Sequence, residues 1–167
     1  ALADLDALVR LAEAEKVDLV VVGPEAPLVE GLADRMRGLG IACFGPSAEA
    51  AEIEASKSFA REVCRAAGVP VARGQSFESV EAALEYVEQL GLPVVIKADG
   101  LAAGKGVAIC ATLAEAESHA RAVIEAGRFG EGPRRVVVEE FLAGQEASVI
   151  ALCDGTEALL LPAARDH

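Results

Sequence analysis

The sequence predicts an α/β protein in which the tail of one doubly wound unit is followed by a second α/β unit. Apolar residues recur at helical spacing over 4–16, and the run 18–23 is typical of a buried strand. A helix expected over 28–39 and a short strand over 41–44 continue the alternation typical of parallel sheets. Because this alternation starts at a helix, we expect that the opening strands of the first unit are missing and that the chain is truncated.

Composition excludes several classes of protein. The 167 residues are 53% hydrophobic and carry a net charge of −12, so the chain is globular rather than disordered. That acidity opposes nucleic-acid binding. The longest apolar run, 158–164, is far shorter than the ~20 residues of a membrane span, so we expect no membrane partner and a cytoplasmic location. The four cysteines lack metal-ligand spacing and are expected to be reduced, buried thiols.

Caps and turn signals divide the rest of the chain. Ser56 and Ser79 are expected to cap helices over 57–67 and 80–90. Thr112 and Glu115 form a predicted capping box for a helix that ends near residue 126. Strands are expected over 93–98, 107–111, 135–140, 147–153 and 157–161, the last two joined by a hairpin turn at Asp154-Gly155. His119 is interpreted as a solvated surface residue.

The stretch 97–107 carries the strongest chemical signal. Glycines on both sides of Lys105, Gly104 and Gly106, allow backbone N–H groups to approach phosphate oxygens, and Lys97 adds a second cation at a strand end. The stretch does not fit a P-loop, because no Ser or Thr follows the lysine and because a strand, not a helix, follows the loop. A dinucleotide fingerprint is also missing, which argues against a reductase domain. The alternative is a flexible hairpin with a solvated lysine.

A second signal follows the strand over 135–140. Glu139, Glu140, Phe141 and Leu142 can form a hinge whose backbone contacts an adenine edge, between apolar walls. Glu146 can accept hydrogen bonds from ribose hydroxyls. The alternative for the two adjacent glutamates is a solvated strand end.

The order of lysine strand, glycine loop, return strand, helix and acidic strand end resembles the ATP-grasp superfamily. Within it, five runs in family order resemble the glycinamide ribonucleotide synthetase (phosphoribosylamine-glycine ligase) family. The runs are GPEAPL (23–28), FGPS (44–47), SKSF (56–59), VIKADGLAAGKGV (95–107) and VEEFLAGQEAS (138–148). The implied fold is the end of a Rossmann-like pre-ATP-grasp domain, then the first part of an ATP-grasp domain with its small α+β lid.

The resemblance also implies a division of the chain. Residues 1–46 would end the substrate-binding domain, 47–72 would start the ATP-grasp core, 73–140 would form the lid, and 141–167 would give the first core strands after it.

Roles for individual residues follow from the resemblance. Lys57 and Lys97 would contact ATP phosphates, and the loop of Gly104, Lys105 and Gly106 would close over them. Adenosine would be held by Glu139, Glu140, Phe141, Leu142 and Glu146. Gly23, Pro24 and Glu25 would line the phosphoribosylamine pocket, and Asp166 would face the amino or ribosyl substrate.

Departures from the family pattern accompany these roles. Arg165 stands where the family usually has glutamine, before Asp166, and Gln145 replaces an acidic residue next to Glu146. The Mg²⁺ ligands expected in the family lie outside this sequence, so no metal ligand is named and the chain alone is expected to be inactive.

The implied activity is an ATP-dependent ligase of purine biosynthesis. Glycine would be activated as glycyl phosphate and joined to 5-phosphoribosylamine, giving glycinamide ribonucleotide, ADP and phosphate, with Lys97 and Lys105 as catalytic residues. Fusion to, or pathway association with, other purine enzymes is compatible with this function. The alternatives are another ATP-grasp carboxylate-amine ligase and a freestanding, non-catalytic nucleotide-binding module.

Overall fold

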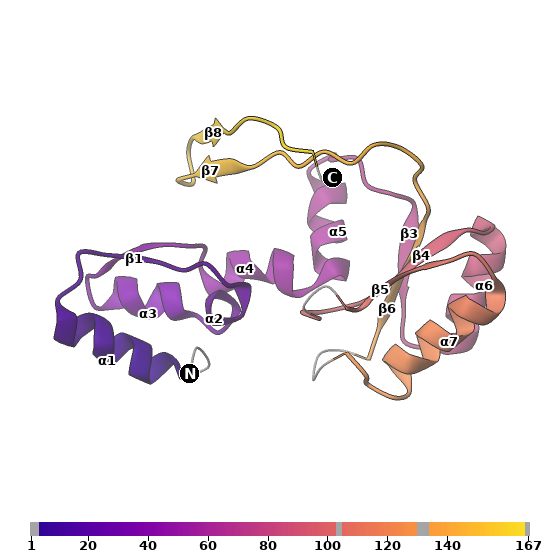
Figure 1. Ribbon diagram of the computed structural model, residues 1–167, viewed down its shortest axis with the longest axis horizontal. Coiled ribbons are helices and arrows are strands. Elements are labelled where there is room, and N and C mark those ends of the chain that lie inside the picture. The colour runs from indigo at the N-terminus through magenta and orange to yellow at the C-terminus, as the bar shows by residue number, and fades with distance from the viewer. Residues whose placement is uncertain (1–3, 103–104, 130–133, 166–167) are drawn as a thin grey trace.

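The computed structural model of the chain describes residues 4–102, 105–129 and 134–165. An N-terminal α/β body lies at one end of the molecule, and a second sheet with two covering helices lies at the other (Figure 1). A helix stands between the two bodies, and a C-terminal hairpin extends apart from the second sheet. The described part of the chain contains no helix that is both long and apolar enough to cross a membrane.

The N-terminal body is a parallel βαβ arrangement, as predicted. It comprises α1 (Leu5–Glu15), β1 (Leu19–Val21), α2 (Glu25–Val29), α3 (Leu32–Gly38) and β2 (Ala42–Phe44). Strands β1 and β2 pair in parallel, and Leu5, Ala12, Leu32 and Met36 form the buried core beneath them. The single helix predicted over 28–39 is wrong. Gly31 adopts a left-handed φ of 88°, which ends one helix and starts the next.

Two capped helices follow this body. Helix α4 (Ala48–Ala55) was not expected; the Ser47 hydroxyl accepts a hydrogen bond from the Ala50 N–H at 3.2 Å. Helix α5 (Lys57–Ala66) confirms the predicted cap, because the Ser56 hydroxyl accepts from the Phe59 N–H, also at 3.2 Å. The two serines therefore fix where each helix begins.

The second body is a four-stranded antiparallel sheet in the order β3-β6-β4-β5. Its strands are β3 (Gly74–Phe77), β4 (Val94–Ala98), β5 (Val107–Cys110) and β6 (Val136–Glu140), and its helices are α6 (Val80–Leu90) and α7 (Leu113–Ile124). The predicted capping box at Thr112 is confirmed, with both of its hydrogen bonds present. Strand β3 was not predicted, because its sequence, GQSF, has no alternating apolar pattern.

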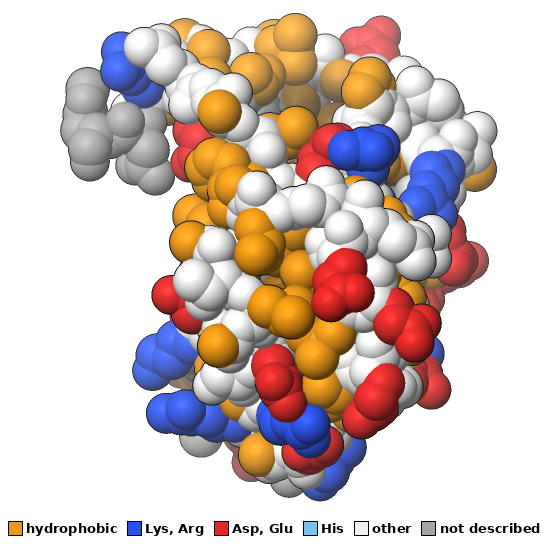
Figure 2. Space-filling model, turned by 90° about the vertical axis from the view of Figure 1, so that its right-hand side faces the viewer, with side chains coloured by type: hydrophobic (Ala, Val, Ile, Leu, Met, Phe, Trp, Pro, Cys, Tyr) orange, Lys and Arg blue, Asp and Glu red, His pale blue; other side chains and the backbone are white. Residues whose placement is uncertain are grey.

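One face of this sheet packs against α6 and α7. Val94, Ile96, Val136 and Val138 are fully buried and belong to the core that includes residues of α6 and α7. Figure 2 views the molecule from the end that carries these two helices, where charged side chains border a band of hydrophobic ones. On α7, Arg121 forms exposed ion pairs with Glu117 and Glu125.

The C-terminal strands β7 (Ala151–Cys153) and β8 (Ala158–Leu160) form the predicted hairpin. Its turn uses Gly155 at a left-handed φ of 98°. The carboxylate of Asp154 accepts hydrogen bonds of 2.8 Å from the Thr156 N–H and hydroxyl and from the Glu157 N–H. These donors, led by the Glu157 N–H, lower the pKa of Asp154 to about 2.

All four cysteines are free thiols, but the expectation that they are buried holds only for Cys110. Burial raises the pKa of the Cys110 thiol above its usual value. Cys43 and Cys64 are half-buried and Cys153 is exposed, because the hairpin that carries Cys153 has no covering layer in the described structure.

Candidate nucleotide-binding site

A pocket of about 640 Å³ is lined by residues of α5, of the second sheet on the face opposite α6 and α7, and of the segment after β6. Seven residues singled out in the sequence line it: Lys57, Lys97, Glu139, Glu140, Phe141, Leu142 and Glu146. The apolar side chains Val71, Val95, Val107 and Ile109 complete much of the lining. The fold thus brings together cations, carboxylates and apolar walls that are up to 89 positions apart in sequence.

An ion cluster of Arg61, Lys97 and Glu139 forms part of the pocket lining. The Lys97 ammonium is 2.6 Å from one carboxylate oxygen of Glu139, and the Arg61 guanidinium donates to the other. The side chains of Arg61 and Glu139 are 8% and 10% exposed, and that of Lys97 is 30% exposed. Lys97 pairs in register with Val137 of β6, so its contact with Glu139 is a diagonal one across adjacent strands.

Arg61 is a site residue that sequence reasoning missed. Its guanidinium also donates to the backbone carbonyls of Ala72, at 2.8 Å, and Gly74, at 3.0 Å. The available signal was its position four residues after Lys57, which puts both side chains on one face of a capped helix.

Lys57 faces the glycine loop rather than open solvent. From the first turn of α5 its ammonium donates a 2.8 Å hydrogen bond to the Gly100 carbonyl. A cation in the first turn opposes the helix dipole, so this position needs acceptor groups around it. The loop carbonyl supplies one of them.

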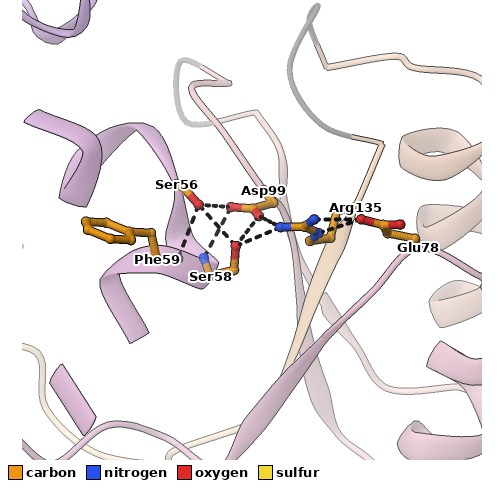
Figure 3. Close-up of polar contacts among 6 residues, drawn as sticks. All are labelled: Ser56, Ser58, Phe59, Glu78, Asp99 and Arg135. Carbon is orange, nitrogen blue, oxygen red and sulfur yellow. Dashed lines mark hydrogen bonds and ion pairs between the residues drawn. The ribbon is translucent and has the colours of Figure 1, made fainter. Parts of the chain in front are cut away.

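Figure 3 shows the polar network that joins α5 to the base of the glycine loop. The Asp99 side chain is fully buried and accepts hydrogen bonds from the Ser56 hydroxyl and the Ser58 N–H, both at 3.2 Å. The Ser58 hydroxyl and the Arg135 guanidinium also donate to it. Arg135 in turn pairs with Glu78 at 2.6 Å, and this bond raises the pKa of the guanidinium. The residues come from α5, the end of β4, the start of β6 and the β3–α6 turn.

The glycine loop is only partly described. Gly104 lies outside the described residues, and Lys105 is exposed and does not line the pocket. Gly106 is buried, and its carbonyl accepts from the Ala98 N–H at 2.6 Å. A Cβ on Gly106 would lie 2.8 Å from the Ala102 Cβ, so glycine is required by close packing.

The interpretation of His119 as a solvated residue is wrong. Its side chain is half-buried, its ring centroid lies 5.3 Å from that of Phe129, and its Nε2 is 3.3 Å from the Gly106 carbonyl oxygen. The alanine-rich and glutamate-rich sequence around His119 does not predict this burial, because the contact with Gly106 depends on where the glycine loop returns to the sheet.

The hinge after β6 combines a fixed start with exposed side chains. Glu140 accepts hydrogen bonds from the Arg73 N–H at 2.7 Å and from its guanidinium at 2.9 Å. These bonds, the backbone one foremost, lower the pKa of Glu140. Phe141, Leu142 and Glu146 are exposed, and all three line the pocket.

The residues expected to bind the second substrate lie elsewhere. Gly23, Pro24 and Glu25 are exposed after β1, and none of them lines the pocket beside α5. Gly23 and Pro24 line a separate apolar pocket of about 320 Å³. Asp166 lies outside the described residues. Within the described ranges, no three His, Cys, Asp or Glu side chains are grouped closely enough to hold a metal ion.

The sheet, its two helices and the lysine-bearing pocket define part of an ATP-grasp protein. Residues 55–167 match the family Phosphoribosylglycinamide synthetase, ATP-grasp (A) domain, and residues 1–54 match the N domain of the same synthetase. The chain therefore belongs to the phosphoribosylglycinamide synthetase family.

Relatives agree with this assignment. The chain is 50% identical over 164 residues to a phosphoribosylamine–glycine ligase of Xanthomonas campestris pv. campestris, a match that covers 98% of this chain and 38% of the relative. The chain thus spans about two-fifths of that relative's length. A crystal structure of phosphoribosylamine–glycine ligase from Thermotoga maritima matches with a TM-score of 0.70 and 37% identity, over 74% of this chain and 32% of that one.

A more distant solved structure carries a nucleotide. The biotin carboxylase domain of a Hydrogenobacter thermophilus 2-oxoglutarate carboxylase matches with a TM-score of 0.70 and 26% identity, over 86% of this chain and 32% of that one. Its crystals contain the magnesium salt of ADP and bicarbonate.

Proposed function

We propose that the polypeptide, at its native length, is an ATP-dependent carbon–nitrogen ligase. It joins glycine to 5-phosphoribosylamine through glycyl phosphate, giving glycinamide ribonucleotide, ADP and phosphate. The observation that carries the proposal is the pocket beside α5, which is lined by Lys57 and Lys97 together with apolar side chains in a chain of this family. The relatives' names supply the substrates.

The pocket fits a nucleoside triphosphate by its chemistry. Val71, Val95, Ile109, Phe141 and Leu142 offer apolar surface for a base. In the proposal, the backbone from Glu139 to Leu142 contacts the adenine edge, and Glu146 accepts from the ribose.

The opposite part of the proposed site holds the phosphates. Lys57 and Lys97 contact phosphate oxygens, and Gly104, Lys105 and Gly106 close over them. These cations act against the −12 charge of the whole chain, so the attraction for a polyanion is local to the pocket.

The proposed catalytic contribution is charge stabilisation and exclusion of water. Lys97 and Lys105 offset the negative charge that spreads over the phosphate oxygens in the transition state. The loop at Lys105 keeps water from the acyl phosphate, which hydrolysis would destroy. Mg²⁺, when bound, neutralises phosphate charge, and we expect its ligands outside this chain.

The remaining assignments belong to the same proposal. Gly23, Pro24, Glu25 and Asp166 line the phosphoribosylamine side. The chain is divided at residues 46, 72 and 140 into the end of the substrate domain, the core start, the lid and the returning core. The reaction takes place in the cytoplasm, and fusion to other purine enzymes is compatible with it.

The test is ADP release by the polypeptide at native length. Release that requires both glycine and 5-phosphoribosylamine supports the proposal. Release with a different carboxylate in place of glycine favours another ATP-grasp ligase, and ATP binding without release under any condition favours a non-catalytic module.

The loop is tested by Lys105→Ala. The substitution should lower turnover by at least about tenfold, because it removes one contact to the transition state. It should leave the unfolding midpoint unchanged, because Lys105 is exposed. An unaltered rate would remove Lys105 from the mechanism.

A further inference from the structure

Arg61 has no role in the proposed function, yet it is one of three buried polar or charged residues in the described structure. A buried guanidinium is costly unless its donors are paired. Here they are paired with the Glu139 carboxylate and with two backbone carbonyls, that of Ala72 just before β3 and that of Gly74, its first residue. Arg61 therefore joins α5, β3 and β6 in the lining of the pocket.

Gly74 gives the guanidinium its path to the pocket. Gly74 of β3 pairs in register with Glu139 of β6. A Cβ on Gly74 would lie 2.5 Å from the Val138 carbonyl oxygen, 2.9 Å from the Glu139 Cγ and 3.1 Å from an Arg61 Nη. Any larger residue would displace either the strand or the guanidinium, so the glycine leaves room for Arg61 to reach Glu139.

Glu139 is shared between two cations through different oxygens. Arg61 donates to Oε1, and the Lys97 ammonium contacts Oε2 at 2.6 Å. If Lys97 were the sole partner of this buried carboxylate, moving the ammonium to a phosphate would leave an unpaired buried charge. With Arg61 in place, the carboxylate stays paired whether or not Lys97 contacts it.

We propose that Arg61 is a positioning residue for the nucleotide phosphates, acting through Glu139 on Lys97. This inference rests on the proposed function, which supplies the nucleotide. Arg61 keeps Glu139 paired, so that Lys97 can transfer its hydrogen bonds from the carboxylate to a phosphate oxygen. The cluster of Arg61, Lys97 and Glu139 then presents a net positive charge to the incoming anion.

The test compares three ligands by isothermal titration calorimetry on the polypeptide at native length: adenosine, ADP and ATP. Adenosine lacks phosphates, so its affinity does not depend on Lys97. The variants are Arg61→Gln, Arg61→Lys, Glu139→Gln and the double variant Arg61→Gln/Glu139→Gln. The matched control is Arg65→Gln, because Arg65 lies one turn further along α5 and donates to the same Gly74 carbonyl, at 2.8 Å, without an ion pair to Glu139.

Arg61→Gln should weaken ADP and ATP binding by about tenfold, equivalent to ~1.4 kcal/mol, and adenosine binding by less than about twofold. Arg61→Lys should recover most of the ADP affinity, because it keeps the positive charge beside Glu139. Arg65→Gln should leave the ratio of ADP to adenosine affinity unchanged. In the Glu139→Gln background, adding Arg61→Gln should no longer change that ratio.

Other outcomes overturn the inference. Equal losses for adenosine and ADP, or a loss of the same size in the Glu139→Gln background, would make Arg61 a purely structural residue. If Arg61→Gln alone does not fold, the double variant Arg61→Gln/Glu139→Gln is compared with Glu139→Gln. An unchanged ratio of ADP to adenosine affinity supports the inference, and a lowered ratio overturns it. Failure of the unsubstituted protein to bind any of the three ligands would instead refute the proposed function.

Discussion

Removing the Asp99 carboxylate should loosen the contact between α5 and the glycine loop. The side chain is fully buried and accepts from the Ser58 N–H, which lies in the first turn of α5. Asp99→Ala leaves that N–H without its acceptor, a cost of about 1–3 kcal/mol. It also breaks the 3.4 Å pair with Arg135, which is half-buried and keeps Glu78 as a partner, so this second loss is nearer ~1 kcal/mol. The expected total is about 2–4 kcal/mol.

Asp99→Asn should cost less than Asp99→Ala. The amide retains one acceptor oxygen and the shape of the side chain, so the loss reduces to the charge-assisted part of the hydrogen bonds, about 1–2 kcal/mol. The control is Asp6→Asn, which breaks an exposed 2.6 Å pair with Arg35 and should cost ~0–1 kcal/mol.

The assay is native-state hydrogen exchange of the α5 amides, because it reports the local opening free energy of this helix separately from the N-terminal body. The predicted order of effects is Asp99→Ala, then Asp99→Asn, then Asp6→Asn. If Asp99→Ala changed the opening free energy of α5 no more than Asp6→Asn does, the buried network would not hold the helix to the loop, and the reasoning would be refuted.

Two further predictions concern the glycine loop and the hairpin. Gly106→Ala places a Cβ within 2.9 Å of two alanine Cβ atoms and should destabilise the chain by about 1–3 kcal/mol in thermal unfolding, whereas Gly144→Ala, with nothing within 4 Å, should not. The pKa of Asp154 is lowered from 3.8 to about 2, so its stabilisation of the turn is complete above pH ~4 and lost as the pH falls through about 2. The amide shifts of its turn partners, followed by NMR, should titrate near pH 2; a midpoint near 4 would contradict the turn geometry.

Local signals in the sequence predicted the capped elements well. Ser79 begins α6 and Thr112 begins α7 as expected, because each side-chain cap depends on residues within one helical turn. The hairpin at Asp154 followed from an equally local turn signal. The parallel pairing of β1 with β2 followed instead from the alternation of helices and strands along the chain.

What the sequence did not predict depends on tertiary context. Helix α4 is rich in alanine and glutamate and has only Ala51 buried, so it carries no apolar stripe. Strand β3 is a strand because β6 offers a free edge for it to pair with. Arg61 and Asp99 were not assigned roles, because their partners are distant in sequence. Arg61 pairs with Glu139, which lies 78 positions away, and Asp99 accepts from Ser58, which lies 41 positions away.

The second sheet separates stability from binding within single strands. Side chains alternate between the two faces of a strand, so β4 directs Val94 and Ile96 into the core while Val95 and Lys97 line the pocket. Strand β6 does the same with Val138 and Glu139. The ion cluster can therefore change its pairing without disturbing the core on the other face. For the same reason, a shift of one residue in register would move both the core and the pocket to the wrong sides of the sheet.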